Sequence, residues 1–186
     1  MNKKIPEYLA LAVLILIAGS MTAVAQQHQQ DARHQDFASS YIEQLDSPVR
    51  GLSTQEVDNL LNGRGAGYAR LAELNGYPGP RHVLDLSSQL DLSTQQVKEI
   101  QVAFEQMQSQ AKNLGRTIVN KEQKLSHAFA SGNIINAELE RETAELARLY
   151  GKLRTTHLQA HLQITPLLSA QQIEKYNRLR GYKMNQ

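Results

Sequence analysis

The longest regular feature of the chain is an apolar pattern that repeats every three to four residues after Ser93. This spacing is typical of a coiled-coil-like helix face, and Lys121 is its only interruption. The segment contains no proline, so the pattern predicts one helix over about 94–130, roughly 55 Å long. Its apolar positions are Val97, Ile100, Phe104, Met107, Ala111, Leu114, Ile118, Leu125 and Ala128.

A second apolar pattern follows a short break at Gly132, a residue that suits a left-handed helix end. It predicts a helix over about 137–164, which ends before Pro166 because proline cannot continue it. The apolar face comprises Leu139, Leu146, Leu149, Tyr150, Leu153, His157, Ala160 and Ile164. Two long helices joined by a short turn predict an all-α fold built on an antiparallel helical hairpin.

Leu158 and Leu162 lie on a different side of this second helix, so it has a further apolar surface that needs a cover. Short helices at 41–91 and 169–180, a second copy of the chain, or a client protein could provide it. A symmetric dimer of hairpins, with short flanking helices, is the simplest of these solutions.

Three similar hexapeptides mark expected helix starts: LSTQEV at 52–57, LSTQQV at 92–97 and LSAQQI at 168–173. In each, a serine precedes Gln or Glu by three residues, which is the arrangement of a capping box. We therefore expect helices to begin after Ser53, Ser93 and Ser169, and each cap contributes about 1 kcal/mol. In the second and third hexapeptides the capping partners are Gln96 and Gln172.

The first 25 residues have the pattern of an export signal. MNKK supplies positive charge, YLALAVLILIAG is apolar, and Ala23-Val24-Ala25 fits a cleavage site before Gln26. The apolar run is shorter than the roughly 20 residues that span a membrane. We expect a cleaved signal peptide and a periplasmic protein, and the alternative is an uncleaved N-terminus anchored in the inner membrane. The absence of Cys suits an oxidising compartment.

The rest of the chain divides into three parts by composition. Residues 26–40 are polar and Gln-rich, which predicts a flexible tether. Residues 41–81 predict short helices separated by Gly and Pro turns, and residues 82–182 form the hairpin domain. Charge is nearly balanced, with 20 Lys and Arg against 18 Asp and Glu, which argues against nucleic acid as a partner.

Three glycines, at positions 63, 65 and 67, suggest a phosphate-binding loop at first sight. A nucleotide loop follows a buried strand, however, and no β-branched run precedes these glycines. We therefore expect no nucleotide. The chain also has no nucleophile elbow, cysteine nucleophile or isolated carboxylate pair, so we expect no enzyme.

His157 and His161 are the candidate metal ligands. Histidines four apart share one face of a helix and can supply two of the four ligands of a transition metal such as zinc. The alternative is that His157 ends the apolar face as a packing residue. Leu158 follows the first histidine where zinc proteases have Glu, so a protease is excluded. Further ligands would come from the candidate donors His82, His127, Glu138 and Glu142.

Leu92-Ser93-x-x-Gln96 and Leu168-Ser169-x-x-Gln172 resemble the paired LTxxQ motifs of the Spy/CpxP family of periplasmic proteins, with Ser in place of Thr. The resemblance covers about residues 82–180. It implies an all-α, often dimeric, hooked hairpin that forms a cradle. Spy-like members are ATP-independent chaperones, CpxP-like members restrain a sensor kinase, and ZraP-like and CnrX-like relatives bind zinc or other transition metals.

Two functions follow as expectations. The first is a chaperone or envelope-stress adaptor that binds unfolded or misfolded envelope proteins, or a sensor kinase. Its client or dimer surface would use adaptable apolar side chains; the candidates are Phe104, Met107, Leu158 and Leu162. The second is a periplasmic zinc, copper or nickel protein for sensing or resistance, based on His157 and His161.

Overall fold

The computed structural model describes residues 39–182, so the predicted signal and most of the predicted tether lie outside the described residues. Every element in this part of the chain is helical, which confirms the all-α fold. The chain divides into two units, residues 1–43 and 44–186, and the second holds all the α-helices of the described part. The elements are η1 (Ile42–Asp46), α2 (Thr54–Leu61), α3 (Arg70–Leu74), α4 (Pro80–Asp85), α5 (Thr94–Ala130), α6 (Asn136–Ile164), η2 (Thr165–Leu167) and α7 (Ala170–Leu179).

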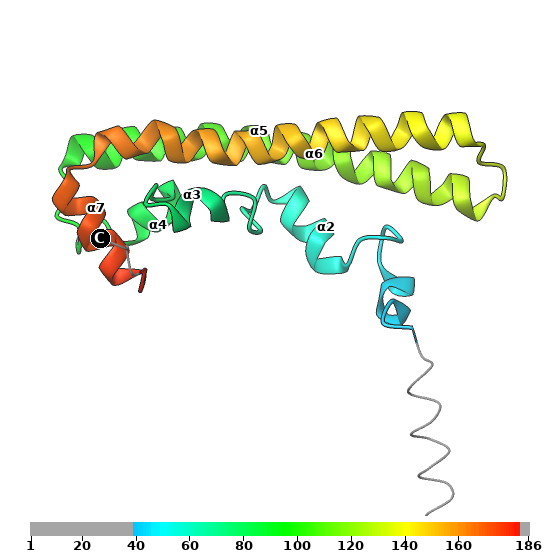
Figure 1. Ribbon diagram of the computed structural model, residues 1–186, viewed down its shortest axis with the longest axis horizontal. Helices are drawn as coiled ribbons and strands as arrows, with labels where there is room; N and C mark the ends of the chain where they lie inside the picture. Colours follow the sequence, from blue (N-terminus) through cyan, green and yellow to red (C-terminus); the bar gives the residue numbers. More distant parts are fainter. Residues whose placement is uncertain (1–38, 183–186) are drawn as a thin grey trace, which may run out of the picture. The chain divides into compact units, whose positions relative to one another are not determined.

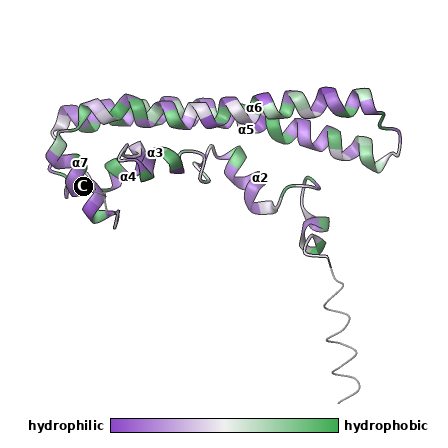
Figure 2. Cartoon of the chain, viewed as in Figure 1, coloured by the Kyte–Doolittle hydropathy of each residue, from purple (hydrophilic) through white to green (hydrophobic). Residues whose placement is uncertain are grey.

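The two long helices, α5 and α6, lie along each other, and the short helices α2, α3 and α4 pack on them (Figure 1). Gly132 has φ +69° in the turn after α5, a left-handed conformation that glycine adopts without steric cost. Both long helices are amphipathic, and apolar and polar residues alternate along them (Figure 2). Helix α4 begins at Pro80, in a stretch that the sequence indicated only as a turn.

Two separate groups of buried side chains hold these helices together. The first cluster joins α2 to the middle of α5 and α6 and comprises Val49, Leu52, Val57, Leu60, Ala111, Ile118, Leu146, Leu149 and Leu153. The second cluster joins α4 and α7 to the other end of the same helices and comprises Val83, Leu90, Ile100, Ala103, Ile164, Leu168 and Tyr176. Most predicted apolar-face residues of α5 and α6 belong to one cluster or pack against it.

The capping boxes at Ser53, Ser93 and Ser169 are all present, with each serine side chain accepting from the backbone three residues on. Gln96 and Gln172 do more than cap. The Gln96 Nε2 donates to Gln172 Oε1 at 2.9 Å, and the Gln172 Nε2 donates back to Gln96 Oε1 at 3.2 Å. The capping boxes of α5 and α7 are therefore joined by two hydrogen bonds between these side-chain amides.

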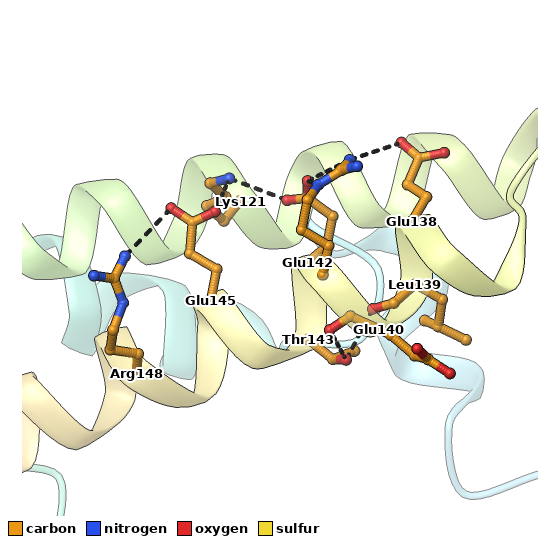
Figure 3. A network of polar contacts seen from close by, with 9 residues as sticks. Lys121, Glu138, Leu139, Glu140, Glu142, Thr143, Glu145 and Arg148 are labelled. Carbon is orange, nitrogen blue, oxygen red and sulfur yellow. Dashed lines mark hydrogen bonds and ion pairs between the residues drawn. The ribbon is translucent and has the colours of Figure 1, made fainter.

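The structure also explains why a charged residue, Lys121, interrupts the apolar pattern. Its ammonium group crosses from α5 to α6 and donates to Glu142 at 3.0 Å and to Glu145 (Figure 3). Hydrogen bonds to these two carboxylates raise the pKa of Lys121. The charged residue thus pairs the two long helices where the apolar pattern is broken.

Helix α2 approaches α5 backbone to backbone at Gly115. A Cβ atom added to Gly115 would lie 1.9 Å from the carbonyl oxygen of Leu60. No side chain fits at this crossing, so the position requires glycine for its lack of volume.

Candidate functional site

A cavity of about 490 Å³ lies between the two hydrophobic clusters, and we call it the central pocket. On α5 it is lined by Phe104 and Met107, which fall between Ala103 of the second cluster and Ala111 of the first. On α6 it is lined by His157 and His161, the two candidate metal ligands. They fall between Leu153 of the first cluster and Ile164 of the second. The other lining residues are Gly63, Arg64, Gly65, Ala66, Gly67, Ala69, Arg70, Glu73, Leu74, Gly79, Pro80, Arg81, His82, Gln108, His157, His161, Arg180 and Tyr182.

His157 lines the pocket and is buried, with 3% of its surface exposed. Its ring stacks on Tyr68, with centroids 5.7 Å apart and planes 9° from parallel. Its Nε2 atom is buried and has no hydrogen-bond partner among the described residues. Burial, together with the neighbouring His161, lowers the pKa of His157 to about 4. The imidazole is therefore neutral at neutral pH, and it packs on Tyr68 while its Nε2 atom makes no hydrogen bond.

His161 is also buried, with 6% of its surface exposed. Its Nδ1 lies 2.9 Å from the Tyr77 carbonyl oxygen, which can only accept, so Nδ1 carries the proton. Gly79 packs closely against the same ring, where an added Cβ would lie 3.0 Å from His161 Cε1. The turn before α4 thus fixes the orientation of His161 and leaves Nε2 with a lone pair.

Among residues 39–182, Glu73 is the one carboxylate that lines the central pocket. The Tyr176 hydroxyl donates to its Oε2 at 2.9 Å, and His82 Nδ1 lies 3.0 Å from its Oε1. Burial by itself would raise the pKa of Glu73, but the hydrogen bonds from His82, Tyr176 and Tyr182 outweigh it and the pKa is lowered. Glu73 is therefore ionised at neutral pH and already engaged with α4 and α7.

The candidate metal donors do not come together as a group. Of the four, His82 lines the central pocket, whereas Glu142 binds Lys121, some 15 residues and about 22 Å of helix away from His157. Glu138 lines a small cavity beside Lys121. Within residues 39–182, no group of three or more His, Asp or Glu side chains is arranged to hold a metal ion.

The predicted client or dimer residues lie in two different places. Phe104 and Met107 line the central pocket, whereas Leu158 and Leu162 line a second depression of about 530 Å³ on the surface of α3 and α6. We call this depression the apolar groove; it also includes Leu71, Ala72, Asn75 and Tyr77. Leu71 is 58% exposed and Leu162 is 59% exposed. Large apolar side chains thus face solvent along one continuous surface.

Sequence reasoning missed Glu73, Arg70 and Arg180 as pocket residues. For Glu73 and Arg70 the signal was the Gly- and Pro-rich context of residues 63–80, which brings the backbone close to α5 and α6 at Gly63 and Gly79. Arg180 lies outside this stretch and had no such signal. No helix of the described part is long and apolar enough to cross a membrane. Comparisons with family models, with curated proteins and with solved structures found no match for this chain.

Proposed function

We propose that this protein is an exported, periplasmic binding protein that acts as an ATP-independent chaperone or envelope-stress adaptor and not as an enzyme. The observation that carries the proposal is the apolar groove, with Leu71, Tyr77 and Leu162 exposed to solvent. Contiguous apolar surface of this kind marks an interaction site in soluble proteins. The paired motifs at Ser93–Gln96 and Ser169–Gln172 support the same class through their resemblance to the Spy/CpxP family.

The chemistry of the groove suits a client that is recognised by apolarity and not by sequence. The groove wall is mainly leucine and tyrosine, with one amide side chain at Asn75. Such a surface lacks the charged groups that fix the register of a folded partner, and burying apolar area provides the driving force. Apolar segments of unfolded or misfolded envelope proteins are the proposed ligands.

The arrangement that we propose in solution is a dimeric cradle in which α5 and α6 form a helical hairpin. The export signal at residues 1–25 would deliver the chain to the periplasm. Sequencing the N-terminus of protein recovered from the periplasmic fraction tests both cleavage and location. A start at Gln26 is expected, whereas a membrane-bound chain that retains Met1 contradicts it.

The decisive experiment compares two variants of equal charge. Leu158→Asp with Leu162→Asp places two carboxylates in the groove, and Phe129→Asp with Ile135→Asp places two at exposed apolar positions near the turn between α5 and α6. Suppression of aggregation is measured by light scattering of a urea-unfolded test enzyme after dilution. We expect the groove variant to need about tenfold more protein for equal suppression, because two apolar contacts are lost.

The same samples are examined by sedimentation velocity. Equal suppression by both variants contradicts the proposal. If the groove variant becomes monomeric while it still suppresses aggregation fully, the groove is an interface between two copies of the chain and not the client surface.

A metal-binding function is the second candidate, favoured by one observation. The Tyr77 carbonyl orients His161 as a second-shell partner orients a metal-ligating histidine, and His157 Nε2 has no competing hydrogen bond. Titration calorimetry with zinc, copper and nickel tests it. Micromolar binding that is lost in His157→Ala with His161→Ala supports a metal site, and no binding at neutral pH leaves these histidines as walls of the pocket.

A further inference from the structure

We propose that the central pocket binds an apolar carboxylate, a ligand with one carboxylate group on a long alkyl chain. This inference goes beyond the chaperone proposal and does not depend on it, because the central pocket and the apolar groove share no lining residue. The argument rests on the charge of the lining, on its apolar floor, and on polar atoms that have no partner in the protein.

The charged side chains of the pocket favour an anion. Four arginines line it, at positions 64, 70, 81 and 180, against the one carboxylate of Glu73. Arg64 and Arg81 pair with aspartates that do not line the pocket, Asp58 and Asp85. Among the described residues, Arg70 and Arg180 form no ion pair. Arg180 donates one hydrogen bond, to the Tyr182 hydroxyl at 3.4 Å. Because neither guanidinium group has a carboxylate partner, each can bind a ligand carboxylate through two parallel hydrogen bonds.

The other half of the lining favours an apolar body. Phe104 and Met107 supply it from α5, and Ala69, Leu74 and Pro80 supply it from the short helices. The guanidinium group of Arg81 lies 5.9 Å from the centre of the Phe104 ring, so the cationic and apolar parts adjoin directly. A volume of about 490 Å³ is within the range of about 300–1,000 Å³ that small-molecule pockets occupy.

Unpaired donors at the pocket reinforce the preference for an acceptor-rich head group. His157 Nε2 is buried without a partner, and in the tautomer protonated at Nε2 the neutral imidazole can donate a hydrogen bond to a carboxylate oxygen. The loop between α2 and α3 contributes backbone amides. Its successive N–H groups at Gly65, Ala66 and Gly67 donate to no backbone acceptor in the described part of the chain. Left-handed residues such as Ala66 and Gly67 allow neighbouring amides to converge on an anion.

These features distinguish an alkyl carboxylate from other ligands. Inorganic phosphate or acetate would leave the Phe104 and Met107 surface uncovered. An alkyl cation would face Arg70 and Arg180 with like charge. The head group and the chain must therefore occur in one molecule, and the protein should require both.

The experiment is titration calorimetry of the purified protein at pH 7.5 with decanoate below its micelle concentration. Acetate, inorganic phosphate and decyltrimethylammonium are titrated in parallel. We expect saturable binding of one decanoate per chain, no detectable heat from acetate or phosphate, and binding of the alkyl cation at least about tenfold weaker. Equal affinity for the cationic amphiphile would overturn the proposal, as would binding of phosphate alone.

Two charge-matched double variants locate the site. Arg70→Gln with Arg180→Gln removes the two unpaired pocket arginines, and Arg148→Gln with Arg178→Gln removes two arginines outside the pocket. The pocket variant should weaken decanoate binding by about tenfold or more, because two charge-assisted contacts are lost, and the control should stay within about twofold. Circular dichroism reports folding, and single arginine variants replace the pair if it unfolds. Equal weakening by both double variants overturns the proposal.

Discussion

Helices α2 and α7 begin with the same capping box, and a hydrophobic cluster holds each against the long helices. Each also has a second attachment, and the two are of different kinds. At α2 the box is isolated: Glu56 accepts from the Ser53 N–H at 2.7 Å and is exposed to solvent. The attachment comes from shape, through the contact of the Leu60 backbone with Gly115. At α7 the box itself is the attachment, because Gln172 also binds Gln96 and the Leu90 carbonyl.

The comparison explains why the residue three positions after the serine differs between the boxes. A carboxylate and an amide cap a helix equally well, since both supply an accepting oxygen. Only an amide can also donate to a second partner. Glutamine at positions 96 and 172 is thus required by the contact between the two boxes, whereas Glu56 has no such contact to make.

The largest expected effect comes from filling the crossing of α2 and α5. Gly115→Ala should lower the free energy of unfolding by about 3 kcal/mol or more, because the added methyl group meets backbone that cannot rotate away. Gly151→Ala on α6 is the matched control, since nothing lies within 4 Å of its added Cβ. It should raise stability by about 0.5–1 kcal/mol. Urea unfolding measures both, and similar effects of the two alanines would show that α2 is not held by close approach.

The next effect separates the two kinds of capping box. Gln96→Glu keeps the cap but removes the Nε2 donor, which leaves the Leu167 carbonyl and Gln172 Oε1 facing a carboxylate. We expect a loss of about 2–3 kcal/mol. The reciprocal change, Glu56→Gln, should stay within about 0.5 kcal/mol. Chemical denaturation at neutral pH tests the pair, and a tolerated Gln96→Glu would mean that the contact between the boxes contributes little.

The third effect is a pH dependence of stability that comes from His157 in the central pocket. The pKa of His157 is lowered in the folded protein, so the unfolded chain binds more protons below its ordinary pKa of about 6.5. The stabilisation from the neutral imidazole is complete above that value and is lost as the pH falls toward 4. Between pH 7 and pH 5 we expect a loss of about 2 kcal/mol.

His157→Phe keeps an aromatic ring next to Tyr68 and removes the titrating group. The variant should lose less than half as much stability over the same interval, as measured by urea unfolding at pH 7 and pH 5. Glu73 adds little there, because its lowered pKa places its own loss of stabilisation below about pH 4.5. An unchanged pH dependence in the variant would place the sensitive group elsewhere.

The helices were predictable from sequence because their signals are local. Ser93 caps the start of α5, Gly132 follows its end and Pro166 follows the end of α6, and the apolar spacing identifies their buried faces. The start of α6 has no side-chain cap. The site was only half predictable. His157 and His161 are recognisable by their spacing, but Glu73 and Arg180 reach the pocket through packing between segments about a hundred residues apart, which no local pattern reports.

The contact between Gln96 and Gln172 joins positions 76 residues apart, and this separation has a kinetic consequence. Closing a long loop costs conformational entropy before any contact compensates for it, so this junction forms after α5 and α6 have paired. Tyr176, a fully buried member of the second cluster, also follows both long helices in the chain. During synthesis, the second cluster therefore remains incomplete until Tyr176 is available, whereas the first cluster can assemble as soon as Leu153 is available.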